Sequence, residues 1–327
     1  MAVHRRTFLH LSAGTTAAAL LTHRAKAEDA YPSRPIRLVV GFSPGAASDI
    51  TARLFAKGAT SVLGQQVVVE NKPGAAGSIA GQYVAHAAPD GYTLFLFALS
   101  TLTNEIINPT PSLNVAKDFT PIALLANGTV VLAVNPATKV RSVAELVALA
   151  KAKPGEVLYG STGTGSIPQL AAELFAQRTG VKLTHVPYPG SPQIAADLIA
   201  GRIAMSFNIA SAMIGQIKAG EITALATAAK KRAVALPDVP TMAEAGIADF
   251  DTSLWLGVAA PAGTPRAVID KVAAAAHQAV QDPDTIETLR KQGYEPLDAG
   301  PDQYAAFIKS ELDRWSGVVR TAGIKAG

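Results

Sequence analysis

The tract Tyr159-Gly160-Ser161-Thr162-Gly163-Thr164-Gly165-Ser166 stands between a short apolar run and a helical pattern that begins near Ile167. This order predicts a strand, a tight glycine loop and a helix start. Free backbone N–H groups and the positive end of the helix dipole face the same point in such a loop. The tract therefore predicts a binding site for an anion.

A second unit near the N-terminus has the same order. Ile36 to Val40 is a continuous apolar run, typical of a strand buried on both faces of a parallel sheet. Gly41-Phe42-Ser43-Pro44-Gly45-Ala46-Ala47 follows, and a helical pattern then runs from Ser48 to about Leu63. We expect the two glycine loops to hold equivalent positions in two lobes that close on one ligand.

The rest of the chain alternates strand and helix patterns at a spacing of roughly 25 to 30 residues, which is typical of parallel α/β packing. Asn127-Gly128 separates two strand patterns and predicts a hairpin. We expect chain crossings between the lobes near Val130 to Val134 and Leu254 to Val258. Everything after Pro265 is predicted to be helical. Lobe 1 is then 28–131 with 256–327, and lobe 2 is 132–255.

The N-terminal segment carries export features. His4-Arg5-Arg6-Thr7-Phe8-Leu9 resembles a twin-arginine signal, and Ala25-Lys26-Ala27 has the A-x-A form of a cleavage site. The apolar stretch between them is shorter than the roughly 20 residues that a membrane-spanning helix needs. We predict that residues 1–27 are a signal peptide, cleaved near Ala27, that sends the protein to the periplasm.

Composition excludes several classes of function. The signal segment holds four of the 29 Lys and Arg residues, so the mature chain has 25 basic and 25 acidic residues and shows no charge signal for nucleic acid. The chain has no cysteine, and His86, His185 and His277 are too scattered to suggest a metal cluster. No pair of carboxylates suggests acid–base catalysis. We predict no metal, cofactor or catalytic residue.

An alternative is a secreted serine hydrolase. Gly41-Phe42-Ser43-Pro44-Gly45 fits the G-x-S-x-G nucleophile turn, with His277 as a conceivable base for Ser43. The oxyanion hole of that turn uses the backbone N–H of the residue after the serine, and Pro44 has none. This residue argues against the alternative.

The tract Tyr159 to Ser166 does not fit either of two nucleotide-binding motifs. Ser166 stands where a phosphate loop needs lysine, and Pro168 stands at the third glycine of a dinucleotide fingerprint. What remains is anion capture by backbone amides and hydroxyl groups.

Single residues outside the loops carry weaker signals. Asp49 is expected to stabilise the dipole of its helix, His185 to be structural, and Trp255 to lie in the core of the hinge. Tyr188, between Pro187 and Pro189, would either stack on a ligand or be a surface aromatic residue of its lobe.

Over nearly all of its mature length the chain resembles the Bug-type periplasmic receptors of tripartite tricarboxylate transporters. The matching segments lie at 31–40, 69–75, 88–94, 159–166, 185–188, 236–241 and 260–265. The resemblance implies a type II-like periplasmic binding protein with two α/β lobes, a ligand closed between them as in a Venus flytrap, and delivery of that ligand to membrane permease subunits.

The resemblance also implies which positions grip ligand carboxylates: Phe42 to Ala47 and Ser161 to Ser166. Ser43 and Ala46 replace a proline and a glycine that are usual in the family. Asn208 replaces an aspartate that pairs with the ammonium group of amino-acid ligands, which favours a plain or aromatic carboxylate or a carboxamide. The predicted ligand-binding residues are Phe42, Ser43, Gly45, Ala46, Ala47, Ser161, Thr162, Gly163, Thr164, Gly165, Ser166, Tyr188 and Asn208.

The function predicted from the sequence is therefore that of a monomeric, non-enzymatic receptor for a small organic carboxylate. An orphan sensor that signals to another partner remains a further alternative.

Overall fold

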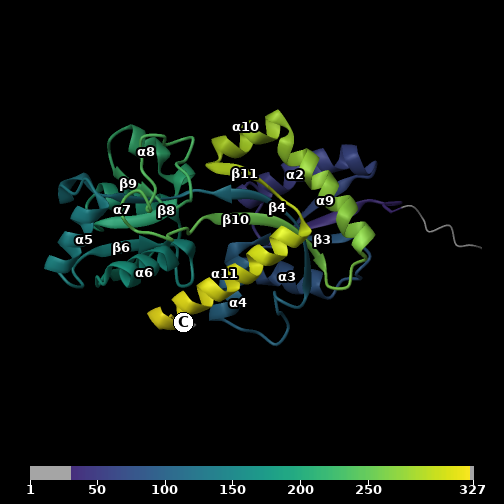
Figure 1. The fold of residues 1–327 in the computed structure, drawn as a ribbon, viewed down its shortest axis with the longest axis horizontal. Coiled ribbons are helices and arrows are strands. Elements are labelled where there is room, and N and C mark those ends of the chain that lie inside the picture. Colours follow the sequence, from purple (N-terminus) through teal and green to yellow (C-terminus); the bar gives the residue numbers. More distant parts are fainter. Residues whose placement is uncertain (1–30, 325–327) are drawn as a thin grey trace, which may run out of the picture.

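The computed structural model describes residues 31–324 and arranges them in two β-sheets with flanking helices (Figure 1). This confirms the predicted class of two α/β lobes. The expected signal peptide, 1–27, lies outside the described residues. None of the helices within 31–324 combines the length and the apolar character that crossing a membrane requires.

The first sheet has six strands. They are β1 (Ile36–Val40), β2 (Val67–Asn71), β3 (Thr93–Ala98), β4 (Phe119–Gly128), β10 (Leu254–Pro261) and β11 (Tyr294–Ala299). Their order across the sheet is β11-β4-β10-β3-β1-β2, with β1, β2 and β3 parallel and the others antiparallel to their neighbours. Its helices are α2 (Ala47–Leu63), α3 (Ser78–Ala85), α4 (Leu99–Ile107), α9 (Arg266–Gln281), α10 (Pro283–Lys291) and α11 (Pro301–Ala322), with a 3₁₀ turn at Ala75–Gly77.

The second sheet has five strands. They are β5 (Val130–Val134), β6 (Leu158–Ser161), β7 (Thr184–Pro187), β8 (Met205–Ile209) and β9 (Thr223–Thr227). The order is β7-β6-β8-β5-β9, and only β5 runs antiparallel to its partners. Its helices are α5 (Val143–Ala152), α6 (Ile167–Thr179), α7 (Ser191–Ile199) and α8 (Ile214–Lys218), with 3₁₀ turns at Pro136–Thr138 and Ala210–Ala212.

The hairpin predicted at Asn127-Gly128 is wrong, because β4 and β5 belong to different sheets. The chain passes from the first sheet to the second at Thr129. Its N–H donates to the Gly293 carbonyl (3.1 Å), and its own carbonyl accepts from the Ala210 N–H (2.8 Å). These bonds hold Thr129 between segments attached to the two sheets. The Asn-Gly signal predicted the wrong pairing because β4 and β5 each pair with strands that are distant in sequence.

The prediction that the chain is wholly helical after Pro265 is also wrong, because β11 pairs with the edge of β4. Its sequence, Tyr-Glu-Pro-Leu-Asp-Ala, lacks the apolar run of a central strand, as suits an edge position that needs only one pairing partner. Helix α4 was not predicted either. It is rich in threonine and isoleucine, which are weak helix formers.

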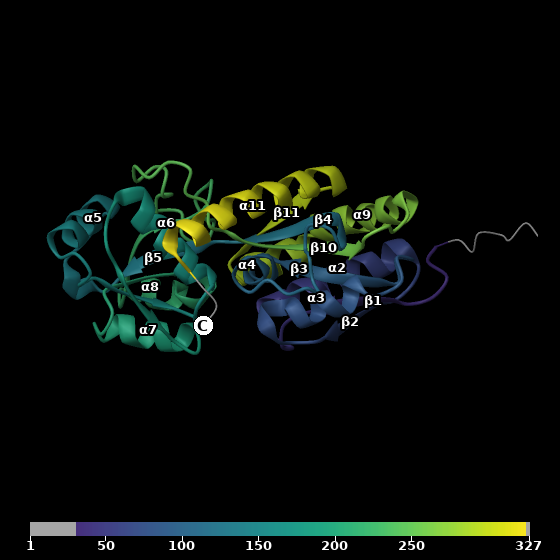
Figure 2. The same cartoon turned by 90° about the horizontal axis from the view of Figure 1, so that it is seen from below.

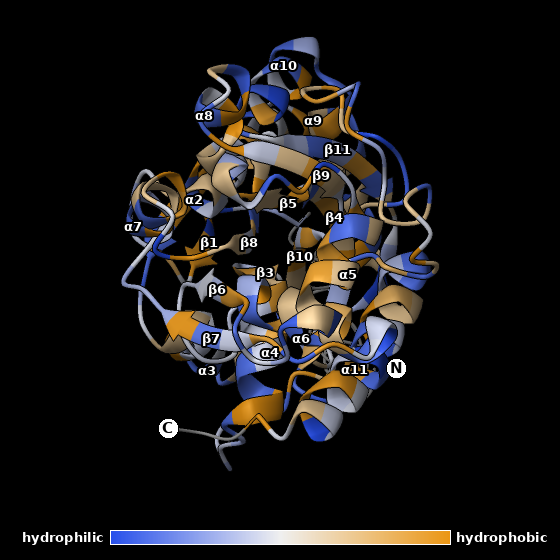
Figure 3. Cartoon of the chain, turned by 90° about the vertical axis from the view of Figure 1, so that its left-hand side faces the viewer, coloured by the Kyte–Doolittle hydropathy of each residue, from blue (hydrophilic) through white to orange (hydrophobic). Residues whose placement is uncertain are grey.

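Helix α11 lies along both lobes (Figure 2). Gln177 on α6 donates to the carbonyl of Val318 on α11 (3.2 Å). Trp255 on β10 is 1% exposed and donates its indole N–H to buried Glu311 on α11 (2.9 Å). It therefore lies in the core, and its place in a hinge stays a prediction. The largest apolar cluster runs from one sheet to the other beneath this helix. Apolar residues gather on the inner strands and on inward helix faces (Figure 3).

Candidate functional site

A cavity of about 530 Å³ is lined by residues from segments attached to both sheets. Segments of the first sheet contribute both polar and apolar residues to the wall. Segments of the second sheet contribute part of the glycine tract 159–166, the starts of α6 and α7, and the end of β8. The lining residues are Phe42, Ala46, Ala47, Ser48, Ala76, Ala98, Ser100, Asn104, Thr162, Thr164, Gly165, Ser166, Ile167, Pro168, Ser191, Ile209, Leu254, Leu256 and Tyr294. We call this cavity the cleft.

The structure brings both predicted loops to the cleft. The predicted residues that line it are Phe42, Ala46, Ala47, Thr162, Thr164, Gly165 and Ser166. Those that do not line it are Ser43, Gly45, Ser161, Gly163, Tyr188 and Asn208. Direct ligand contact by any of these residues stays a prediction. Ser161, Gly163 and Gly45 hold the loops in shape, as their hydrogen bonds show below.

Four helices begin at the cleft: α2 at Ala47, α4 at Leu99, α6 at Ile167 and α7 at Ser191. The first-turn N–H groups of a helix have no acceptor within it, and the helix dipole makes that end positive. Among the described residues, the lining contains no Lys, Arg, His, Asp or Glu side chain. The cleft therefore offers backbone amides and hydroxyl groups to an anion, with no side-chain charge of either sign.

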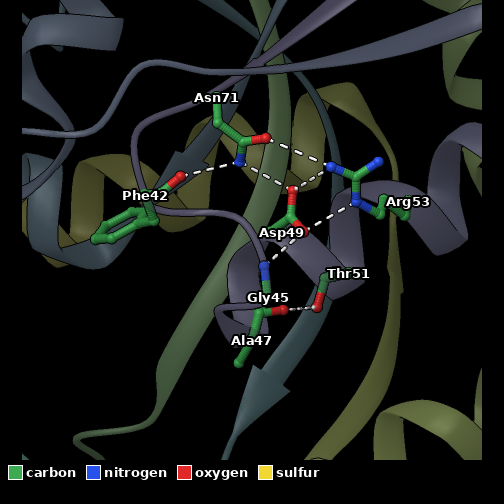
Figure 4. A network of polar contacts seen from close by, with 7 residues as sticks. All are labelled: Phe42, Gly45, Ala47, Asp49, Thr51, Arg53 and Asn71. Atoms are coloured by element: carbon green, nitrogen blue, oxygen red, sulfur yellow. Dashed lines mark hydrogen bonds and ion pairs between the residues drawn. The ribbon is translucent and has the colours of Figure 1, made fainter.

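Asp49 holds the first loop from behind (Figure 4). Its carboxylate accepts the Gly45 N–H (2.9 Å), two bonds from Arg53 (2.9 and 3.0 Å) and one from the Asn71 side-chain amide (2.9 Å). The same Asn71 nitrogen donates to the Phe42 carbonyl (2.9 Å). Burial opposes the charge on Asp49, but these donors outweigh it and hold the carboxyl pKa below its usual value. The expected dipole role is thus joined by a larger one, fixing residues 42–45.

A parallel arrangement fixes the second loop. Ser161 is fully buried; its hydroxyl accepts the Gly163 N–H (3.1 Å) and lies 2.5 Å from His185 Nε2. Gln169, on the first turn of α6, accepts the Gly165 N–H (2.7 Å) through Oε1. Gly163 and Gly165 have φ values of +108° and +77°, a region that favours glycine.

Asn208 lies behind the cleft on β8 and is 3% exposed. Its Oδ1 accepts the Ser191 hydroxyl (2.9 Å) and the Ile209 N–H (2.8 Å), and both of these residues line the cleft. Its Nδ2 is buried and has no hydrogen-bond partner among the described residues. An unused buried donor of this kind is uncommon, which marks this corner as one where a bound group can supply an acceptor.

Tyr188 lies away from the cleft lining. Its backbone N–H donates to the Ser161 carbonyl (2.8 Å), and its hydroxyl donates to Asp197 (2.8 Å). Burial, followed by the bond to Asp197, raises the pKa of Tyr188 to about 12. Tyr188 is thus a half-buried residue that is bonded to the second loop, and its contact with a ligand stays a prediction.

Sequence reasoning missed several residues of the wall. Ser100 and Asn104 come from α4, Tyr294 from β11, and Leu254 and Leu256 from β10. A signal for Ser100 was present, because it follows a buried strand at the edge where β1 also ends. Tyr294 carries no local signal, since its place depends on the pairing of β11 with β4.

The serine hydrolase alternative finds no support. His277, the conceivable base for Ser43, instead pairs through Nδ1 with Asp298 Oδ2 (2.7 Å) on the surface formed by α9 and β11. Ser43 itself does not line the cleft.

A larger hollow of about 880 Å³ lies on lobe 1 alone, beside α3. Its main cations are already engaged: Arg34 pairs with Asp90 (3.1 Å), and Arg37 donates to Tyr83 (2.9 Å) and Thr93 (3.1 Å). We place the candidate site in the smaller cleft because that cleft joins both lobes.

Comparison with known proteins agrees with this geometry. The model of the TctC family, the tripartite tricarboxylate transporter family receptor, matches residues 51–324. Protein BugT of Bordetella pertussis is 38% identical over 299 residues, covering 91% of this chain and 92% of BugT. A structure of an R. palustris protein with adipate is 35% identical with a TM-score of 0.76, covering 90% of this chain and 99% of that one. MatC from Rhodopseudomonas palustris with bound malate is 31% identical with a TM-score of 0.72, covering 88% and 100%.

The family match spans most of the chain, and the overall fold is shared with a solved periplasmic transporter protein that is 40% identical with a TM-score of 0.76, covering 90% of this chain and 99% of that one. The chain belongs to the TctC family, the solute-binding receptors of tripartite tricarboxylate transporters.

Proposed function

We propose that this protein captures a small organic carboxylate in the cleft and performs no chemistry on it. The observation that carries the proposal is the convergence of four helix N-termini on a cavity without charged side chains. Hydrogen bonds to a charged group contribute roughly 1.5 to 3 kcal/mol each, and micromolar binding needs about 8 kcal/mol. Roughly three to six such bonds are enough, and the helix starts of the two lobes together can supply them.

The composition of the wall supports a carboxylate with an apolar body. Leu254, Leu256 and Ile209 contribute apolar side chains to the lining of the cleft, and Thr162 and Thr164 contribute hydroxyl groups. Relatives with adipate and with malate show that receptors of this architecture take dicarboxylates. The absence of an acid from the described lining, with Asn208 behind it, disfavours ligands that carry an ammonium group.

The two lobes, 28–131 with 256–327 and 132–255, close on the ligand as bodies joined at the crossings. The exported receptor then delivers its ligand, as a monomer, to the permease subunits of a tripartite tricarboxylate transporter. A twin-arginine signal directs export, which N-terminal sequencing of the periplasmic protein would test: we expect the mature chain to begin at Glu28.

The function is tested by a melting-temperature screen of the mature protein. The compounds are aliphatic mono-, di- and tricarboxylates, aromatic acids, and the amide of each acid. A ligand at 100 times its Kd adds about 2.7 kcal/mol to stability, which raises the melting temperature by several degrees. We expect carboxylates to do so and simple amines not to. A flat response to every acid, or hydrolysis of an activated ester that Ser43→Ala abolishes, would overturn the proposal.

A further inference from the structure

A chain of hydrogen bonds links the second loop to His185 on β7. Gly165 N–H donates to Gln169 Oε1 (2.7 Å), and Gln169 Nε2 lies 3.4 Å from His185 Nδ1. On the other side of the ring, His185 Nε2 lies 2.5 Å from the Ser161 hydroxyl, which accepts the Gly163 N–H (3.1 Å). Both glycine amides of the loop are thus connected to one imidazole.

This arrangement fixes the protonation state of the imidazole. Because a backbone N–H can only donate, Gly165 requires an oxygen, and Gln169 must turn Oε1 toward it. The Gln169 Nε2 amide, a donor, then faces His185 Nδ1, which must be an unprotonated acceptor. The proton of the neutral ring lies on Nε2 and is donated to the Ser161 hydroxyl.

A second proton on His185 disrupts the matching of donors and acceptors along Gly165, Gln169 and His185. With Nδ1 protonated, two donors face each other across the contact with Gln169. If the Gln169 amide turns over to offer Oε1 to the imidazolium, its NH₂ group faces the Gly165 N–H instead. Either way the charged ring leaves one donor opposed by another, and the amide of a cleft-lining residue loses its fixed direction.

The groups around His185 come from the two elements that pack on its ring. Strand β6 contributes Tyr159, which stacks on the imidazole with centroids 5.1 Å apart. Helix α6 contributes Glu173, which accepts from the Tyr159 hydroxyl (2.7 Å). Burial lowers the pKa of His185, while the charge of Glu173 opposes that effect. The neutral ring is therefore the resting form near neutral pH.

We propose that neutral His185, acting through Gln169 and Ser161, is a positioning residue that anchors the N–H groups of Gly163 and Gly165 and so holds the loop 161–166 in the shape that binds the ligand, so that affinity falls when the ring takes up a proton. This inference rests on the proposed function of the cleft. The expected pH effect on affinity is opposite to that of direct charge attraction, because an imidazolium that attracted an anionic ligand would strengthen binding on acidification.

The binding test uses adipate as the probe, with calorimetry at about pH 7.5 and about pH 5. For wild-type protein we expect Kd to rise on acidification by about tenfold more than for His185→Gln, the equivalent of one hydrogen bond. Gln169→Glu gives the imidazolium an oxygen at Nδ1 and keeps an acceptor for Gly165, so the loss of affinity should disappear. His86→Gln, at the exposed residue that follows α3, is the matched control and should behave as wild type.

A second measurement needs no ligand. Long-range ¹⁵N NMR of the mature wild-type protein should show the neutral ring protonated on Nε2, and the Gly165 amide resonance should shift as His185 titrates. If adipate does not bind at either pH, the proposed function fails for adipate, and the NMR result alone decides the positioning role. A ring protonated on Nδ1, a Gly165 amide that ignores the titration, or wild-type and His185→Gln proteins with equal pH dependence would overturn the inference.

Discussion

Asn208 is the neutral polar residue that lies behind Ser191 at the cleft. Its Oδ1 already accepts from Ser191 and Ile209, so only the unpartnered Nδ2 is free to respond to a ligand. A carboxylate at this position could keep both existing bonds through one oxygen. Its second oxygen would stand where the amide nitrogen now lies, buried and charged, and would need a cationic partner.

We therefore expect Asn208→Asp to reverse a preference between two ligands with the same carbon skeleton. Wild-type protein should bind glutarate more tightly than L-glutamate, and the variant should favour L-glutamate by about tenfold, since a buried ion pair replaces an unpaired carboxylate. Calorimetry with both ligands measures the ratio. An unchanged ratio would mean that Asn208 does not sense the bound molecule.

Asp49 makes the stability contributed by the first loop depend on pH in the acidic range, below the range in which His185 acts. Its pKa is depressed in the folded protein, so its contribution to stability is present above the unfolded value of 3.8 and is lost as pH falls through the lowered folded pKa. Asp49→Asn should cost about 1 to 2 kcal/mol at neutral pH, and the difference from wild type should shrink below about pH 4. Urea unfolding at several pH values tests this. Asp270→Asn, which breaks an exposed pair with Arg266, is the control and should change stability by less than about 0.5 kcal/mol.

The elements that bring these residues together differ in how far the sequence predicts them. Strand β1 and the glycine loop after it could be predicted from the sequence because every residue from Ile36 to Val40 except Arg37 is buried, and the chain must then turn at the sheet edge. The same holds for β6 and the loop 161–166. Each loop follows a strand that is parallel to its neighbours in its own sheet, and so lies at the carboxyl edge of that sheet, where ligands bind in α/β folds.

Other elements could not be predicted because their partners are distant in sequence. Helix α4 forms from weak helix formers, where packing against α11 and the turn at Ala75–Gly77 decides the conformation. Strand β11 needs the edge of β4, about 170 residues earlier in the chain, and no local pattern encodes that pairing. Ser100, Asn104 and Tyr294 enter the wall of the cleft through these two elements, so sequence reasoning missed them.

The junction between the lobes is built around Thr129. The expected crossing near Val130 is present. It is held by hydrogen bonds from Thr129 to two other segments, one before β11 and one after β8. Gly293, with φ of +73°, accepts the Thr129 N–H at its carbonyl, and a Cβ at Gly293 would lie 2.9 Å from the backbone nitrogen of Ser211. The backbones of the two lobes thus meet at a point where no side chain fits.

Gly293→Ala should therefore act as a wedge at this junction. The added methyl group meets backbone atoms that cannot rotate away, so the 3₁₀ turn at Ala210–Ala212 must shift and the lobes should close less completely. We expect about tenfold weaker adipate binding and a larger radius of gyration at saturating adipate, measured by small-angle scattering. Gly155→Ala is the matched control, because Gly155 has a similar φ of +81° with nothing within 4 Å of the added atom. Its backbone strain alone should lower stability without changing closure. Equal behaviour of the two variants would therefore show that contact between residue 293 and Ser211 does not limit the motion of the lobes.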